Sequence, residues 1–300
     1  MVVSIQTTDV KILEALADLV RLKAEFIKNR VVFVKSDRML AIVKALGATE
    51  LDIEKIKHVS DGLSSDPTLP FRKSKNGRFC FDFEKYQVRR LEFQPFVLSA
   101  EENFVRHDSG QTRMFEEVGN DLQLNSVQQA LFIFKTFMLQ GVSTIHRPKL
   151  DYDCHDFICT LFNLRTVTNE GMVGEPALEG VHEDGVDFTM TTYLGSENMT
   201  ADSAITFVHD VKEKNGLRWN ETNPDLALGS VQHTQFLDTL LFADHERKHS
   251  LSPVTAVDPT KPATRDMLIF FTRKPVVKGH VSYPYDSLKP HPDLKMEINL

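Results

Sequence analysis

The feature that most constrains the fold is a change in the residue pattern near position 157. From there on, short apolar segments rich in Val, Leu, Ile, Phe and Thr alternate with turn-rich stretches. Runs of this length, bounded by Gly, Asn, Asp and Pro, are typical of buried or half-buried β-strands. The predicted strands cover residues 157–167, 186–194, 204–208, 239–243 and 267–272.

The chain before residue 157 is mostly helical in its pattern. Apolar side chains recur at helical spacing, polar residues suited to capping precede them, and Gly47 and Gly141 are good stop signals. One stretch of Ser, Asp, Gly, Pro and Lys has no periodicity and predicts a loop. The expected elements are a helix over 12–26, a strand over 31–34, a helix over 39–46, a loop over 58–77 and a helix over 127–139.

Strands that follow a helical region predict an α+β fold in which helices brace an antiparallel β core. We expect residues 1–75 to form a mostly helical segment that packs on the core. Residues 76–300 should form the core itself, including the brace helix 127–139, so that the chain has a single domain overall. The strand pattern alone does not separate a jelly roll from other β architectures.

Charge and cysteine content exclude several classes of function. The chain has 35 basic and 42 acidic side chains, a net charge of −7, which disfavours binding to nucleic acid or to an anionic membrane. Its three cysteines, Cys80, Cys154 and Cys159, form no CxxC pair and cannot build a disulfide framework. The first residues lack the pattern of a secretion signal, and no apolar stretch reaches the length of a membrane span. We expect a cytoplasmic protein.

A short polar motif lies just before the predicted strand 186–194. In it, His182 and Asp184 are two residues apart, so that on an extended backbone their side chains point to the same face. An imidazole and a carboxylate on one face can share a metal ion. Taken alone, His-x-Asp is frequent by chance, and a polar junction between strand and turn is the ordinary interpretation.

Two later features make the metal interpretation stronger. After the predicted strand 239–243, a polar turn leads to His249 on a second extended segment. Arg265 then opens a strongly apolar strand, where a buried guanidinium needs an anionic partner. Two histidines and one carboxylate form the facial triad that holds Fe(II) and leaves coordination positions open. A 2-oxo acid and O2 can take those positions, and an arginine can pair with the distal carboxylate of 2-oxoglutarate.

At these residues the chain resembles the Fe(II)/2-oxoglutarate-dependent dioxygenases over roughly residues 75–275. Pro176–Gly185 is similar to the Pro-x-x-Glu-Gly-x-His-x-Asp-Gly signature of the branch that includes bacterial isoleucine hydroxylases. His249–Pro253 and Arg265–Leu268 are similar to its His-x-x-x-Pro and Arg-Asp-x-Leu blocks. The resemblance implies a double-stranded β-helix (a cupin-like jelly roll) with Fe(II), 2-oxoglutarate and O2.

The resemblance also implies roles for individual residues. His182, Asp184 and His249 would be the iron ligands, and Arg265 would anchor 2-oxoglutarate. Arg165 and Arg78 stand where the branch has arginines and would meet a substrate carboxylate. Apart from the resemblance, Asp187 is a candidate either for a hydrogen bond to a ligand imidazole or for an acid of the turn.

The implied substrate is a small free amino acid of the valine or isoleucine type. The chain is also similar to fungal oxygenases that convert valine-type amino acids into aziridines in alkaloid pathways. Three alternatives stay open: hydroxylation by the same family, a cupin-like metal isomerase that needs no 2-oxoglutarate, and a non-enzymatic metal-binding scaffold. His245 is the alternative distal ligand, although its neighbours predict a solvated turn.

Overall fold

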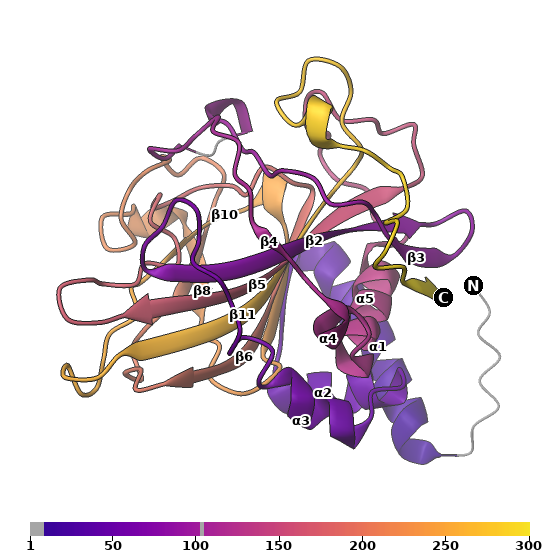
Figure 1. The fold of residues 1–300 in the computed structure, drawn as a ribbon, viewed down its shortest axis with the longest axis horizontal. Coiled ribbons are helices and arrows are strands. Elements are labelled where there is room, and N and C mark those ends of the chain that lie inside the picture. The colour runs from indigo at the N-terminus through magenta and orange to yellow at the C-terminus, as the bar shows by residue number, and fades with distance from the viewer. Residues whose placement is uncertain (1–8, 103–104) are drawn as a thin grey trace.

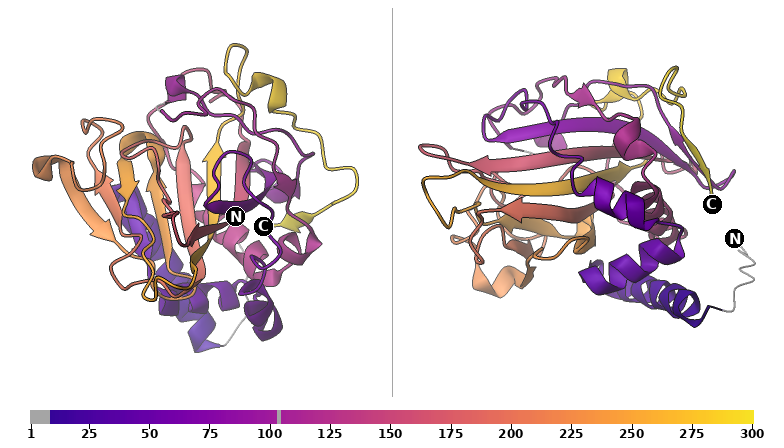
Figure 2. Two further views of the ribbon diagram at one scale, coloured as in Figure 1. Left: turned by 60° about the vertical axis from the view of Figure 1, so that its left-hand side comes forward. Right: turned by 60° about the horizontal axis from the view of Figure 1, so that its bottom comes forward.

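The structure, a computed structural model, describes residues 9–102 and 105–300, and a large β-sheet dominates it (Figure 1). Helices gather on one face of this sheet, and the remaining strands and loops lie on the other side (Figure 2). The helices are α1 (Val10–Asn29), α2 (Ser36–Ala45), α3 (Glu50–Ile56), α4 (Asn120–Gln123) and α5 (Ser126–Leu139). The strands are β1 (Val31–Val34), β2 (Arg72–Asp82), β3 (Gln87–Arg90), β4 (Glu116–Glu117), β5 (Phe157–Thr168), β6 (Phe188–Glu197), β7 (Thr206–His209), β8 (Ala227–Val231), β9 (Thr239–Ala243), β10 (Lys248–Leu251), β11 (Ala263–Arg273) and β12 (Glu297–Asn299).

The strands form two sheets. The large sheet has the order β1-β9-β6-β11-β5-β2-β3-β12, with β4 beside β2, and the small sheet has the order β10-β7-β8. All pairings between neighbours are antiparallel except the short β2–β4 pair. Two mostly antiparallel sheets with few helices agree with the predicted α+β class and are consistent with a jelly roll.

Side chains alternate between the two faces along the long central strands. On β11, Leu268 and Phe270 belong to the core cluster that the helices share, whereas Met267, Ile269 and Phe271 line a cavity on the opposite face. This period of two is what an extended backbone imposes. One face of the sheet therefore builds the core, and the other face builds the cavity.

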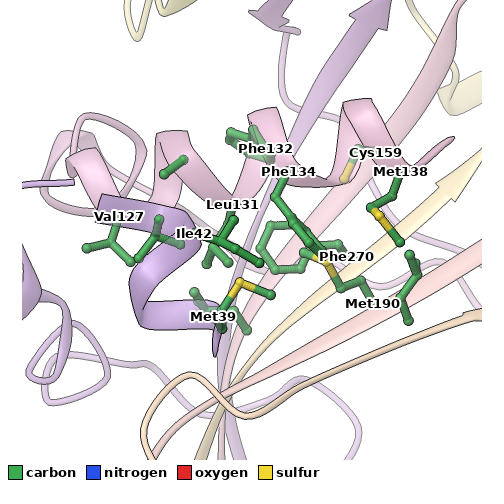
Figure 3. Packing of buried hydrophobic residues seen from close by; sticks show 14 of the residues in the cluster. Met39, Ile42, Val127, Leu131, Phe132, Phe134, Met138, Cys159, Met190 and Phe270 are labelled. Atoms are coloured by element: carbon green, nitrogen blue, oxygen red, sulfur yellow. The ribbon is translucent and has the colours of Figure 1, made fainter. Parts of the chain in front are cut away.

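The core joins the sheet to the N-terminal helices and α5. Phe132 of α5 is fully buried and contacts the rings of Phe79, Phe81 and Phe270. Figure 3 shows side chains of α5, of α2 (Met39 and Ile42) and of the sheet (Met190 and Phe270) meeting in one cluster. Helix α5 is apolar on most of its circumference, as expected of a helix that is buried on both sides. It is buried as the predicted brace helix should be.

Most predicted elements agree with the structure, but the loop over 58–77 and helix α3 differ from the prediction, and β3, β4, α4, β8 and β12 have no predicted counterpart. The strand over 31–34 and the helix over 127–139 are confirmed, and Asp9 caps α1 by accepting from the Lys11 N–H. The predicted loop over 58–77 is wrong for its last six residues, which begin β2. Helix α3 precedes that loop and was missed because it has only seven residues.

The predicted boundary at residue 75 falls within β2, and β1 pairs with β9 in the same large sheet. Residues 1–8, on which the expectation about a secretion signal depends, lie outside the described residues. No helix in the described part of the chain is both long enough and apolar enough to cross a membrane.

Candidate functional site

The site begins with a pair of histidines on two different segments. His182 lies in the loop before β6, and His249 lies on β10 of the small sheet. Their backbones exchange two hydrogen bonds, from His182 N–H to the His249 carbonyl at 3.0 Å and back at 3.1 Å. Their rings lie 4.2 Å apart because paired residues on antiparallel strands point to the same face.

Asp184 completes a group of three. Its Oδ1 lies 3.3 Å from His182 Nε2 and 3.8 Å from His249 Nε2. Its Oδ2 accepts a hydrogen bond from the Thr189 hydroxyl at 2.7 Å, which leaves Oδ1 to face the two nitrogens. Among residues 9–102 and 105–300, this is the one group of three or more His, Cys, Asp or Glu side chains whose ligand atoms lie close enough to share a metal ion.

Two glycines shape the loop that carries His182 and Asp184. Gly180 and Gly185 have φ values of +74° and +77°, in the left-handed region that side chains with a Cβ rarely adopt. A Cβ on Gly180 would also lie 2.4 Å from the Leu217 carbonyl oxygen. The Gly180 carbonyl faces Nδ1 of His182 at 2.8 Å, so that the same turn orients the imidazole.

A buried ionic network supports the loop that carries His182 and Asp184. The Asp244 carboxylate accepts hydrogen bonds from the backbone N–H of Asp184 at 2.8 and 2.9 Å, and from the Arg147 guanidinium at 2.8 Å. Arg147 also donates to Glu183 at 2.7 Å, which in turn faces His245. The prediction of a solvated turn at 244–248 is therefore wrong for Asp244, which is fully buried.

The electrostatics of the three residues favour a cation. Burial alone would lower the pKa of His182, but the carboxylates of Glu179 and Asp184 raise it to about 9. Burial and the neighbouring His182 lower the pKa of His249 to about 4. The site therefore stabilises one positive charge beside Asp184, and a neutral imidazole is the form of histidine that binds a metal.

Arg265 enters the cavity from the start of β11. It is buried, and among the described residues no carboxylate pairs with its guanidinium and no hydrogen bond to it is found. Burial lowers its pKa to about 10, which expresses the cost of an enclosed charge. Its neighbour Asp266 is held by Arg165 through two contacts of 2.7 Å. Arg265 is therefore suited to an external carboxylate.

The structure places Arg165, Arg78 and Asp187 outside the lining of the cavity that contains the triad. Arg165 lies on the face of β5 opposite the cavity and is paired with Asp266, and Arg78 donates to Asp286 at 2.8 Å outside the cavity lining. Asp187 accepts from the Tyr152 hydroxyl at 2.5 Å and from a backbone N–H, and it makes no hydrogen bond to His182 or His249. His245 likewise lies outside the group of three.

The site also contains residues that the sequence did not predict. Asp184 is held by Thr189 on β6 and by Asp244, which Arg147 contacts in turn. Glu179 lies inside the signature and lines the cavity. Asp244 directly follows the apolar strand β9, but the charged residues after it are typical of a surface turn and gave no signal of its burial. The arginines of the cavity wall carry no local signal, since they lie far from the motif in sequence. These are Arg72, Arg106 and Arg113.

The residues present fit iron and 2-oxoglutarate. Two imidazole nitrogens and one carboxylate oxygen are the donor set of the facial triad for non-haem Fe(II). The Nε2 of His249 faces Asp184 Oδ1 at 3.8 Å, and its buried Nδ1 has no protein partner in the described part of the chain. Arg265 supplies the unpaired positive charge for a dicarboxylate in the same cavity.

Comparison with known proteins agrees with this geometry. The family model described as 2OG-Fe dioxygenase matches residues 57–271. The bifunctional enzyme flvA of Aspergillus flavus is 47% identical over 292 residues, which cover 97% of this chain and 36% of that protein. The chain thus spans about a third of the length of this relative.

Solved structures support the same assignment. The Fe(II)/α-ketoglutarate-dependent dioxygenase TqaL is 49% identical, with a TM-score of 0.83 and coverage of 97% of this chain and 98% of that one. A bsmA homologue from Methylobium petroleophilum shares the fold alone, with 19% identity, a TM-score of 0.68 and coverage of 87% and 95%. The family model and the similarity to TqaL favour the oxygenase over the metal isomerase and over the scaffold. The chain belongs to the 2OG-Fe dioxygenase family and is an Fe(II)/2-oxoglutarate-dependent dioxygenase that uses O2.

Proposed function

We propose that the enzyme oxidises an unactivated C–H bond of a small free amino acid of the branched-chain type, such as valine or isoleucine. The observation that carries this proposal is the composition of the cavity beside the triad, which combines apolar rings with charges of both signs. When bound, iron, 2-oxoglutarate and O2 would supply the oxidant for such a bond, and 2-oxoglutarate would leave as succinate and CO2.

The apolar part of the cavity suits a branched aliphatic side chain. The Phe162 ring lies 5.0 Å from the Phe96 ring and 5.7 Å from the Phe271 ring, and all three line the cavity. Ile269 and Met267 continue this surface along β11. Burial of a valine or isoleucine side chain here removes apolar surface from water and excludes water from the reacting carbon.

The charged part of the cavity suits a carboxylate. Arg72 pairs with Asp66 at 2.7 Å, and Asp108 pairs with Arg106 at 2.6 Å and with Arg113 at 3.7 Å. These three arginines contact Asp66 and Asp108, and Arg106 also lies 3.7 Å from Glu179. Burial, followed by repulsion from Arg106 and Arg72, lowers the pKa of Arg113 to about 10. An amino-acid carboxylate relieves this repulsion.

These arginines replace Arg165 and Arg78 in the proposal for substrate binding. Arg165 and Arg78 are each paired with an aspartate away from the cavity, whereas the wall arginines lie in the same cavity as the triad. A carboxylate held at the wall leaves the side chain of the amino acid free to reach the apolar rings.

For the outcome we propose closure of an aziridine ring in secondary metabolism, as the resemblance to fungal oxygenases implies. In that reaction the amino acid loses one hydrogen from carbon and one from nitrogen, and a C–N bond forms. One oxygen atom of O2 enters succinate and the other leaves as water. Hydroxylation would instead place that second oxygen atom in the product. We also propose that the two sheets form a double-stranded β-helix.

The test is an assay with Fe(II), 2-oxoglutarate, O2 and a panel of free amino acids, in which succinate and product mass are read together. The proposal expects succinate that depends on valine or isoleucine, and a product lighter than the substrate by two hydrogen atoms. A product heavier by one oxygen atom would contradict ring closure alone. No succinate above the background with any amino acid would contradict the proposed substrate class.

A further inference from the structure

Glu179 is an acidic side chain in the cavity that no step of the proposed function has used. It lies three residues before His182, its side chain is 8% exposed, and it lines the same cavity as the triad. Such a carboxylate is costly to bury unless a cation or several hydrogen-bond donors compensate it.

The donors around Glu179 do not satisfy it. Its Oε1 lies 3.1 Å from His182 Nε2, the nitrogen that faces Asp184 Oδ1. A metal bound to that nitrogen removes the N–H that would donate to Glu179. Its Oε2 is buried and has no hydrogen-bond partner in the described part of the chain, and Arg106 Nη1 lies 3.7 Å away, beyond hydrogen-bond distance.

We propose that Glu179 binds the ammonium group of the amino-acid substrate, an inference that rests on the proposed function. An ammonium group carries one positive charge and three N–H donors, which is what a buried carboxylate with an unused oxygen lacks. Since Arg106 lies within 4 Å of Glu179, one wall of the cavity offers a cation and an anion to the two charged groups of a zwitterion.

This arrangement makes Glu179 a determinant of specificity for amino acids. An amino acid adds one charge of each sign to the wall, so that its binding leaves the net charge of the cavity unchanged. A 2-hydroxy acid of the same shape brings only the negative charge and no ammonium donor for the Glu179 Oε2. Sites that pair a buried polar group with a substrate group reject analogues that lack it.

The experiment compares wild type with Glu179→Gln in the enzyme loaded with Fe(II) and 2-oxoglutarate under anaerobic conditions. Calorimetry measures the Kd of the preferred amino acid, valine or isoleucine, and of its 2-hydroxy analogue. We expect Glu179→Gln to raise the Kd of the amino acid about 10- to 100-fold, because a charge-assisted hydrogen bond is lost. The Kd of the 2-hydroxy analogue should change less than about threefold.

Two further variants make the test specific. Glu179→Asp keeps the charge and should retain part of the preference for the amino acid. Glu175→Gln makes the same substitution on the same loop, where the carboxylate pairs with Arg218 at 2.7 Å and does not line the cavity. It should leave both Kd values unchanged. The visible absorbance of the Fe(II)–2-oxoglutarate complex reports whether each variant keeps an intact metal site.

Several results would overturn the inference. One is an equal change in both Kd values in Glu179→Gln, or no change in either. Another is loss of the visible absorbance in Glu179→Gln, which would assign Glu179 to the metal site. If wild type itself binds no amino acid of the panel, the proposed function fails, and this outcome is distinct because it appears before any variant is made.

Discussion

In the described part of the chain, no carboxylate forms an ion pair with the buried guanidinium of Arg265 in the cavity. Replacing it by alanine should weaken 2-oxoglutarate binding about 10- to 100-fold, because a charge-assisted contact to the distal carboxylate is lost. Anaerobic titration of the Fe(II)-loaded enzyme with 2-oxoglutarate measures this effect through the visible absorbance of the complex. Arg165→Ala is the control, since Arg165 pairs with Asp266 on the other face of the sheet. Equal weakening in both variants would contradict the role assigned to Arg265.

Asp244 acts on the metal through the backbone of Asp184. Asp244→Asn keeps the shape but removes one carboxylate oxygen from the N–H groups and from Arg147, so Asp184 loses its support. Losses of this kind cost about 10- to 100-fold in metal affinity. Equilibrium titration with Fe(II) under anaerobic conditions measures the change.

The matched control for Asp244 is Glu246→Gln, two residues along the same turn. Glu246 pairs with Arg30 at 2.6 Å and makes no contact with the triad. The Glu246→Gln substitution should lower the free energy of unfolding without a change in Fe(II) affinity. Unchanged Fe(II) affinity in Asp244→Asn would show that the loop holds its shape without the buried network.

The residues of the triad could be predicted from the sequence, but the residues that hold the triad in place could not. His182, Asp184 and His249 stand at motif spacing in a fixed order, and spacing in a sequence is visible. Asp244 stands in a run of charged residues that is typical of a surface turn, and only tertiary packing buries it. The alternation of strands excludes Arg165 from the cavity, although this requires knowledge of which face of β5 is the inner one.

Helix α5 contains a fully buried lysine. Lys135 is fully buried, its Nζ donates to the Phe270 carbonyl at 2.5 Å, and burial lowers its pKa to about 7. In the unfolded chain a lysine has a pKa of about 10.4. Between these two values the unfolded state binds more protons than the folded state. The free energy of unfolding therefore rises with pH over this window.

Lys135→Met tests this assignment. The contribution of Lys135 should grow by on the order of a few kcal/mol between pH 7 and pH 10. Denaturant unfolding of both proteins across this range gives the difference, and groups that titrate in both cancel. We expect wild type to gain stability relative to Lys135→Met as the pH rises. A difference that is constant with pH would mean that Lys135 stays charged in the fold.

Elements with a clear period were predictable, whereas β2 was not. The first half of β2 reads Arg-Lys-Ser-Lys-Asn, which favours a loop by composition. It is a strand because β5 pairs with all of β2 except its last residue, so a neighbour far away in sequence determines it. Helix α3 has too few residues for its period to be visible.

At the scale of the whole molecule, the two sheets bring the triad together. His182 and Asp184 precede β6 of the large sheet, and His249 lies on β10 of the small sheet. A metal at the triad therefore joins the two sheets across the cavity. The same arrangement places Arg265, from a central strand of the large sheet, in the cavity with the triad.

The assignment of His182, Asp184 and His249 as iron ligands is tested by measuring anaerobic Fe(II) binding in the presence of 2-oxoglutarate. The proteins compared are wild type and four alanine variants. We expect one Fe(II) per chain and the visible absorbance of the complex in wild type and in His245→Ala, whose imidazole faces Glu183. Both signals should be lost in His182→Ala, Asp184→Ala and His249→Ala. Iron binding that survives in His249→Ala and disappears in His245→Ala would contradict the assigned triad.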